Sequence, residues 1–185
     1  MVDLTAAKTG SINTLDTIKE IKQNTKLNLQ FGGGVRTNEQ VIELVSSGVD
    51  KIIIGSLSIQ NKNEFEKIVA NNNSEKFVVA IDSNNESILT KGWTENSGVP
   101  IYDHINYCAD LSVNTFLCTD VSKDGTLSGP NTALYGKIME KHPDINLIAS
   151  GGISSLHDII MLETLNLHAA VVGKAIYENK IKLED

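Results

Sequence analysis

The chain has 185 residues, of which 41% are hydrophobic and 21% charged, and this composition is typical of one ordinary globular domain. The formal net charge of −7 argues against a nucleic-acid or anionic-membrane partner, since both require a concentrated basic surface. No apolar run approaches the roughly 20 residues of a membrane span, and residues 1 to 20 lack the pattern of a secretory signal, so we expect a cytoplasmic protein.

Short β-branched runs alternate with stretches of helical spacing along the chain. In chain order, the runs predict strands near 1 to 4, 27 to 31, 51 to 55, 77 to 82, 115 to 119, 145 to 149 and 169 to 173. Helical spacing of apolar residues predicts helices around 12 to 21, 41 to 45, 101 to 112, 131 to 141 and 154 to 166. The alternation predicts an α/β fold with a parallel sheet buried on both faces.

The cysteines and histidines do not indicate a metal site. Cys108 and Cys118 lie in apolar stretches, where cysteine usually acts as a small core residue. The histidines are scattered, each in or beside a predicted helix, at His104, His142, His157 and His168. We therefore expect no bound metal.

An internal repeat runs through the sequence. The segments "FGGGVR" and "ASGGIS" place Gly33 and Gly151 118 positions apart, and Gly55 and Gly173 share this offset. Upstream, "VDLTAAKTG" is similar to "TDVSKDGTLSG", so that Asp3 pairs with Asp120 at an offset of 117. A repeat of four strand-helix units predicts a (βα)8 TIM barrel built from two duplicated half-barrels.

The repeat also predicts that the barrel is truncated at its N-terminal end. Moving the segment 77 to 82 back by 118 positions places its counterpart before residue 1. We therefore expect a single domain over 1–185 with about seven strands, made of a first half-barrel remnant at 1–75 and a second half-barrel at 76–185. A strand left unpaired beside such a gap is expected to associate with another chain or to rearrange.

Each Gly-Gly pair follows a strand and precedes a helix, where backbone N–H groups and the helix dipole can hold a phosphate. Two such turns predict a small-molecule substrate with two phosphates, although glycines at these positions can also simply form tight turns. The predicted phosphate-binding residues are Gly33, Gly34, Gly55 and Ser56 in the first half and Ser150, Gly151, Gly152, Gly173 and Lys174 in the second.

Four aspartates lie at or just beyond predicted strand ends, where a barrel gathers its functional groups: Asp3, Asp82, Asp120 and Asp124. Asp82 follows the apolar run "FVVAI", so desolvation can keep its carboxyl protonated as a general acid requires, unless it only caps the next element. The hydroxyl of Thr119 is placed to orient a neighbouring carboxyl or the substrate. Asp3 is a candidate substrate-binding residue.

Two further side chains are candidate substrate contacts. Trp93 lies in the polar segment "TKGWTENSG", where its ring can stack on a planar substrate, although tryptophan more often fills a core. Arg36 directly follows "GGGV" and can balance substrate charge or form an ordinary surface ion pair.

Several motifs together resemble, in order and across essentially the whole chain, those of the phosphoribosylformimino-aminoimidazole carboxamide ribotide isomerase family of histidine biosynthesis. They are "VDLTAAKTG", "FGGGVRT", "IIIGS", "AIDS", "KGW", "TDVSKDGTLSGPN", "IASGGIS" and "AVVGKAIYE". The related cyclase subunit shares the barrel and the glycine turns, but "KGW", "DGTLSGPN" and "GKAIY" favour the isomerase. The resemblance implies an Amadori rearrangement of the aminoaldose ProFAR to the aminoketose PRFAR by general acid/base catalysis without a cofactor.

The resemblance also assigns roles to single residues. Asp82 matches the family's general acid, Asp124 matches a second aspartate that can take this role when loops close, and Thr119 supports both. The family's base is an aspartate at the end of the first strand, which the repeat places before residue 1. We therefore expect this chain to be inactive or nearly so and the intact enzyme to be monomeric. The alternatives are a non-catalytic phosphate-binding module and a dual-specificity isomerase that also acts on phosphoribosylanthranilate.

Overall fold

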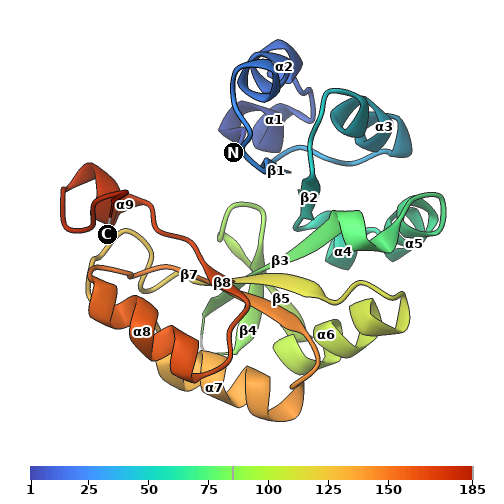
Figure 1. Ribbon diagram of the computed structural model, residues 1–185. Helices are drawn as coiled ribbons and strands as arrows, with labels where there is room; N and C mark the ends of the chain where they lie inside the picture. Colours follow the sequence, from blue (N-terminus) through green and yellow to red (C-terminus); the bar gives the residue numbers. More distant parts are fainter. Residues whose placement is uncertain (85, 185) are drawn as a thin grey trace. The chain divides into compact units, whose positions relative to one another are not determined.

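The computed structural model describes residues 1–84 and 86–184, in which helices alternate with mostly parallel strands (Figure 1). The strands are β1 (Gln30–Gly32), β2 (Lys51–Ile54), β3 (Phe77–Asn84), β4 (Ser87–Thr90), β5 (Glu95–Pro100), β6 (Thr115–Asp120), β7 (Asn146–Ser150) and β8 (Ala169–Ala170). The α-helices are α1 (Leu4–Thr9), α2 (Leu15–Asn24), α3 (Asn38–Ser46), α4 (Leu57–Gln60), α5 (Lys62–Ala70), α6 (Ile101–Asp110), α7 (Thr132–Lys141), α8 (Leu156–Thr164) and α9 (Lys174–Tyr177). A 3-10 helix, η1, spans Ser74–Lys76.

The chain divides into two compact units. The first unit comprises Met1–Val79 with Cys108–Val113, and the second comprises Ala80–Tyr107 with the segment that begins at Asn114. Strand β3 contributes its first residues to the first unit and the rest to the second.

In the first unit, β1, β2 and the start of β3 pair side by side and parallel. Phe31 lies opposite Ile52, and Ile52 lies opposite Phe77, and all three side chains are fully buried. Leu44 from α3 and Phe65 from α5 are buried as well. Large apolar side chains on adjacent parallel strands and on the helices between them thus form the core of this unit.

In the second unit, β3, β6, β7 and β8 are neighbours in that order. Phe116 pairs with Leu147 in parallel register, and Ile148 pairs with Ala169. Helices α6, α7 and α8 lie along one side of these strands (Figure 1). The buried Phe116 on β6 and Tyr135 on α7 are among the largest side chains in the core of this unit.

The two copies of the repeat pair their strands in the same register. Gln30 lies opposite Lys51 in the first unit, and the residues 118 positions later, Ile148 and Ala169, lie opposite each other in the second. The α/β fold class is therefore confirmed. The path β1-β2-β3-β6-β7-β8 follows the order of the chain except for the hairpin β4-β5, which is consistent with the predicted (βα)8 barrel.

Two features differ from the predicted elements. The strand expected near residues 1 to 4 is wrong apart from one parallel bridge between Val2 and Gly32, because Asp3 caps α1 and turns the chain into a helix. The antiparallel hairpin β4-β5 was not predicted, because the polar segment "ENSGVP" pairs only with β4 and shows no buried alternation.

Candidate active site

The Gly-Gly pairs adopt the same backbone conformation in both units. The φ angles are +112° and +76° at Gly33 and Gly34 and +99° and +83° at Gly151 and Gly152, in the left-handed region that disfavours other residues. Each turn is also crowded: a β-carbon at Gly34 would collide with the carbonyl oxygen of Ala6, and one at Gly152 would collide with that of Gly129. Both turns therefore require glycine for close backbone approach as well as for φ.

An aspartate holds the loop that packs against each glycine turn. In the first unit, Asp3 accepts hydrogen bonds from the Ala6 amide at 2.7 Å and from the Thr14 hydroxyl at 3.1 Å. In the second unit, Asp120 accepts bonds from Ser122 and, at 2.6 Å, from the side-chain amide of Asn131, which lies 117 positions after Thr14. Asp3, a predicted substrate contact, is thus buried and uses both carboxylate oxygens to cap α1 and fix this loop.

Burial would raise the pKa of Asp120, but its hydrogen bonds to Ser122 and Asn131 outweigh burial and lower the pKa. This carboxyl is therefore ionised at neutral pH and suits a structural role. The repeat places the same arrangement around both segments, so the two aspartates of "VDLT" and "TDVS" both fix the backbone that follows them.

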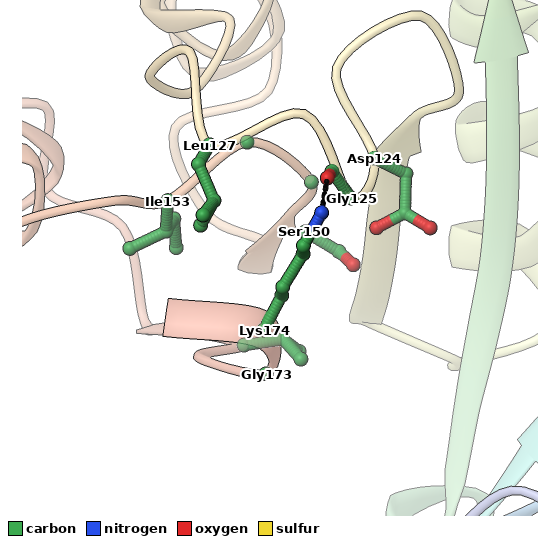
Figure 2. Close-up of a pocket in the computed structure, with 10 residues that line it drawn as sticks. Asp124, Gly125, Leu127, Ser150, Ile153, Gly173 and Lys174 are labelled. Atoms are coloured by element: carbon green, nitrogen blue, oxygen red, sulfur yellow. Dashed lines mark hydrogen bonds between the residues drawn. The ribbon is translucent and has the colours of Figure 1, made fainter. Parts of the chain in front are cut away.

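A pocket of about 70 Å³ opens in the second unit between three segments (Figure 2). This volume has room for about two water molecules and so suits one small oxyanion. Asp124, Gly125 and Leu127 come from the loop after β6, Ser150, Gly151, Gly152 and Ile153 come from the turn after β7, and Val171, Gly173 and Lys174 come from the segment after β8. All five phosphate-binding residues predicted in this half line this one pocket.

Lys174 crosses this pocket to its opposite wall. Its ammonium nitrogen donates to the carbonyl oxygen of Gly125 at 2.8 Å, as Figure 2 shows. Gly125, Leu127, Ile153 and Val171 were missed by the sequence reasoning. Only their position beside the glycine turns could have indicated them, because apolar residues and lone glycines carry no chemical signal.

Asp82 lies partly buried on β3, two residues before the end of the strand. Burial raises the pKa of its carboxyl, hydrogen bonds to the side chains of Trp93 and Thr119 partly offset this, and the negative charge of Asp124 raises the pKa further. The structure therefore brings four predicted site residues together in the second unit. Thr119 on β6 is buried and lies opposite Ser150 of the pocket turn on β7. Since β3 neighbours β6, Asp82 and the pocket lie on adjacent strands.

Trp93 lies in the turn between β4 and β5, with φ +71° and 44% of its surface exposed. Its side chain is hydrogen-bonded to Asp82 and does not fill the core. The predicted stacking of Trp93 on the substrate stays a prediction.

The first unit places its predicted residues at the ends of β1 and β2. Gly32 lies opposite Ile53, so Gly33 follows β1 close to where Gly55 and Ser56 follow β2 and lead into α4. Arg36 is directed toward α1, where its guanidinium donates to the Ala7 carbonyl oxygen at 3.2 Å. Arg36 thus ties the turn to the neighbouring loop, and no ion pair of its side chain is seen among the described residues.

Residues 1–84 and 86–184 contain neither a membrane-spanning helix nor a metal cluster. No helix in this part of the chain has the length and apolarity to cross a membrane. No group of three or more histidine, cysteine, aspartate or glutamate side chains in it is arranged to hold a metal ion. Cys108 and Cys118 are both buried free thiols, and burial raises the pKa of Cys108 to about 12.

Comparison with known proteins gives consistent matches along the chain. A model of the family described as "Histidine biosynthesis protein" matches residues 1–182. A protein of Leuconostoc mesenteroides is 37% identical over 183 residues, a match that covers 99% of this chain and 77% of the relative. Proteins of Leptospira biflexa and Clostridioides difficile are 37% and 40% identical, each covering 100% of this chain and 76% of the relative.

All three relatives carry one name, 1-(5-phosphoribosyl)-5-((5-phosphoribosylamino)methylideneamino)imidazole-4-carboxamide isomerase. The chain spans about three quarters of the length of these relatives.

Proposed function

The chain belongs to the histidine biosynthesis protein family, and from this premise we propose that it is an aldose-ketose isomerase for the aminoaldose in its relatives' name. The reaction is an Amadori rearrangement. A proton is donated to the ring oxygen of the amino-substituted ribose, and the ring opens to an iminium. Loss of the proton on the second sugar carbon then gives an enolamine, and the aminoketose forms when the first carbon gains a proton and the hydroxyl on the second carbon loses one. Atoms and electrons balance within the substrate, so the reaction needs acid and base groups only.

The state of Asp82 is the observation that carries this proposal. A general acid works best when its pKa lies near the operating pH, so the pKa of a carboxyl must be raised by burial or by a nearby like charge. Burial raises the pKa of Asp82, and the nearby charge of Asp124 acts in the same direction. Asp82 is therefore suited to donate the proton that opens the ring.

The hydrogen-bond partners of Asp82 suit the carboxylate that remains after the proton has been donated. After it has donated its proton, the carboxylate carries a negative charge in a partly buried place. Hydrogen bonds from the indole of Trp93 and the hydroxyl of Thr119 stabilise this charged form. The arrangement thus supports both the protonated acid before transfer and the carboxylate after it.

Asp124 lies at the edge of the pocket, close enough to raise the pKa of Asp82, and its side chain is exposed. An exposed carboxylate on a loop can change its distance to the substrate when the loop moves. We therefore assign Asp124 the second acid/base role. It can exchange protons with the substrate once the loop after β6 closes.

The substrate's two phosphates match the two glycine turns. In the second unit, the pocket lined by Ser150, Gly151, Gly152, Gly173 and Lys174 combines turn backbone with one cation, which suits one phosphate. In the first unit, the turn at Gly33 and Gly34 has the same left-handed conformation, and Gly55 and Ser56 follow the neighbouring strand. The equal geometry of the turns supports a phosphate-binding role for each.

Residues 1–185 contain no counterpart of the aspartate to which the resemblance assigns the role of base. Loss of one general base typically reduces a rate by about 10²- to 10⁴-fold. The test is therefore a single-turnover assay with the 185-residue protein in excess over the aminoaldose, run beside a calorimetric titration of the same ligand. We expect binding and slow conversion, and Asp82→Asn removes the conversion while it keeps the binding.

The matched control is Asp144→Asn, an exposed aspartate before β7 that lies outside the pocket. It is expected to behave as the unaltered chain. Equal conversion by the Asp82→Asn variant would overturn the assignment of the acid. Tight binding with no conversion in any variant would favour the non-catalytic phosphate-binding module. Conversion of phosphoribosylanthranilate in the same assay would add the second specificity.

A further inference from the structure

The loop of residues 121–129, here called the Asp124 loop, forms one wall of the pocket in the second unit. Its first turn is held at the base, where the carbonyl oxygen of Asp120 accepts bonds from the amides of Lys123 and Asp124. Its last residue is held at the glycine turn, where the Gly129 amide donates to the Gly152 carbonyl oxygen at 2.9 Å. Between these two ends, the loop carries the residues that face the pocket.

The middle of the Asp124 loop stores conformational strain. Leu127 has φ +54°, a left-handed conformation that costs a non-glycine residue about 1–2 kcal/mol, whereas Gly125 adopts φ +68° without this cost. Such a conformation persists only where surrounding contacts hold it. Within the loop, Thr126 is bonded to the Lys123 carbonyl oxygen and to the Ser128 hydroxyl. From outside the loop, the Lys174 ammonium donates to the Gly125 carbonyl oxygen at 2.8 Å.

Lys174 also lines the pocket, and a lysine ammonium carries three N–H donors. One of them is directed to Gly125, so the others can donate to an oxyanion held at Gly151 and Gly152. The same nitrogen can then contact the anion and the loop at once. An ion in the pocket fixes the lysine, and the lysine fixes the residue next to Asp124.

We propose that Lys174 is a positioning residue that couples phosphate binding in this pocket to the conformation of the Asp124 loop. The inference rests on the proposed function, since it takes a phosphate as the occupant of the pocket. Coupling of this kind is reciprocal: a bound phosphate holds the loop, and a held loop strengthens phosphate binding by the same factor. A bound phosphate thereby holds Asp124 more firmly in place.

The first unit contains a comparable tie, which supports this reading of Lys174. Arg36 donates to the carbonyl oxygen of Ala7, which lies in α1, 117 positions before Asp124. The two cations come from different places, one after the glycine turn and the other after β8. In each unit, a basic side chain thus donates to a backbone carbonyl oxygen in the segment that packs against the glycine turn, although the two basic residues are not equivalent in the repeat.

The experiment uses the 185-residue chain with inorganic phosphate as the probe. Phosphate binding is measured by calorimetry, and the amide hydrogen exchange of residues 124–128 is measured with and without phosphate. In the unaltered chain, saturating phosphate is expected to slow exchange in these residues by at least about fivefold. Lys174→Met is expected to weaken phosphate binding by roughly tenfold, because a charged hydrogen-bond donor is lost.

The decisive comparison is made at phosphate concentrations that saturate each variant. Lys174→Met is expected to show no slowing of exchange in residues 124–128, Lys174→Arg is expected to restore part of it, and the exposed Lys180→Met serves as the matched control with full slowing. Equal slowing in the saturated Lys174→Met variant would overturn the coupling and leave the phosphate site intact. Failure of the unaltered chain to bind phosphate at all would instead overturn the phosphate site of the proposed function.

Discussion

Replacement of Gly152 by alanine tests whether the glycine turns require close backbone approach. Alanine at φ +83° costs roughly 1–2 kcal/mol in backbone strain. Its β-carbon would collide with the Gly129 carbonyl oxygen and lie 3.1 Å from the β-carbon of Lys123. Relief of this collision breaks the 2.9 Å bond from the Gly129 amide to Gly152, worth about 0.5–1.5 kcal/mol. The free energy of unfolding should therefore fall by about 1.5–3.5 kcal/mol.

Two other glycines of the same unit separate strain from collision. Gly98 has φ +70° with open space where the β-carbon of an alanine would lie, so Gly98→Ala should lose only the strain, roughly 1 kcal/mol. Gly136 lies inside helix α7 with the nearest atom 3.8 Å away, so Gly136→Ala should gain about 0.5–1 kcal/mol. The free energy of unfolding should thus be lowest in Gly152→Ala, higher in Gly98→Ala and highest in Gly136→Ala.

Urea denaturation of the four proteins, with the slope of the transition compared alongside its midpoint, measures these differences. The loss of unfolding free energy in Gly152→Ala must exceed that in Gly98→Ala by more than about 0.5 kcal/mol, which is the size of effect that ordinary surface substitutions have. Equal losses would refute the reasoning, because they would show that the turn yields to a side chain at no cost and that glycine is present for its φ alone.

Three further variants test the site. Because burial raises the pKa of Asp82, the folded protein keeps a proton that the unfolded chain loses near pH 3.9, so the free energy of unfolding falls as pH rises through the folded pKa. Asp82→Asn should remove this fall. In urea titrations the variant should be more stable than the unaltered chain at pH 7 but not at about pH 3. Tyr135→Phe loses the 2.7 Å bond to the Ser150 carbonyl oxygen and should lower the unfolding free energy by about 1–2 kcal/mol in the same assay. Asn131→Ala loses its bond to Asp120 and the cap of α7, so differential scanning calorimetry should show a melting temperature lower by roughly 3–12 °C, and an unchanged value would contradict the role of this pair.

The parallel strands were predictable because each is a continuous apolar run that ends at a polar or glycine-rich turn. Buried strands such as β3, β6 and β7 leave this signal in the sequence alone, since both of their faces lie against other elements. The glycine turns were predictable for a different reason. One Gly-Gly pair has little meaning, but two pairs at the offset shared by Gly55 and Gly173 indicate a common requirement of the backbone.

What the sequence did not reveal depends on side-chain partners. Asp3 and Asp82 both follow apolar residues near a strand end, and only hydrogen bonds separate them: Asp3 caps a helix, while Asp82 is bonded by Trp93 and Thr119. The β4-β5 hairpin was missed because its two strands pair with each other and carry few apolar residues. The hydrogen bond from Lys174 ends on a backbone carbonyl oxygen, which every residue possesses, so no residue type in the sequence can predict it.

The duplication separates what holds the backbone from what carries out chemistry. Positions that fix backbone have similar residues in both halves, because the same loop and turn must be held twice: Asp3 and Asp120, Thr14 and Asn131, and the helix caps Thr37 and Ser155. Two of the positions proposed to act on the substrate do not match: the repeat equivalent of Asp124 is Ala7, and that of Lys174 is Ser56. A symmetric framework suits two similar phosphates, whereas the proton transfer takes place at one sugar only. The acid and base groups must therefore differ between the halves, and the unmatched positions of the repeat are where mutations should change turnover more than stability.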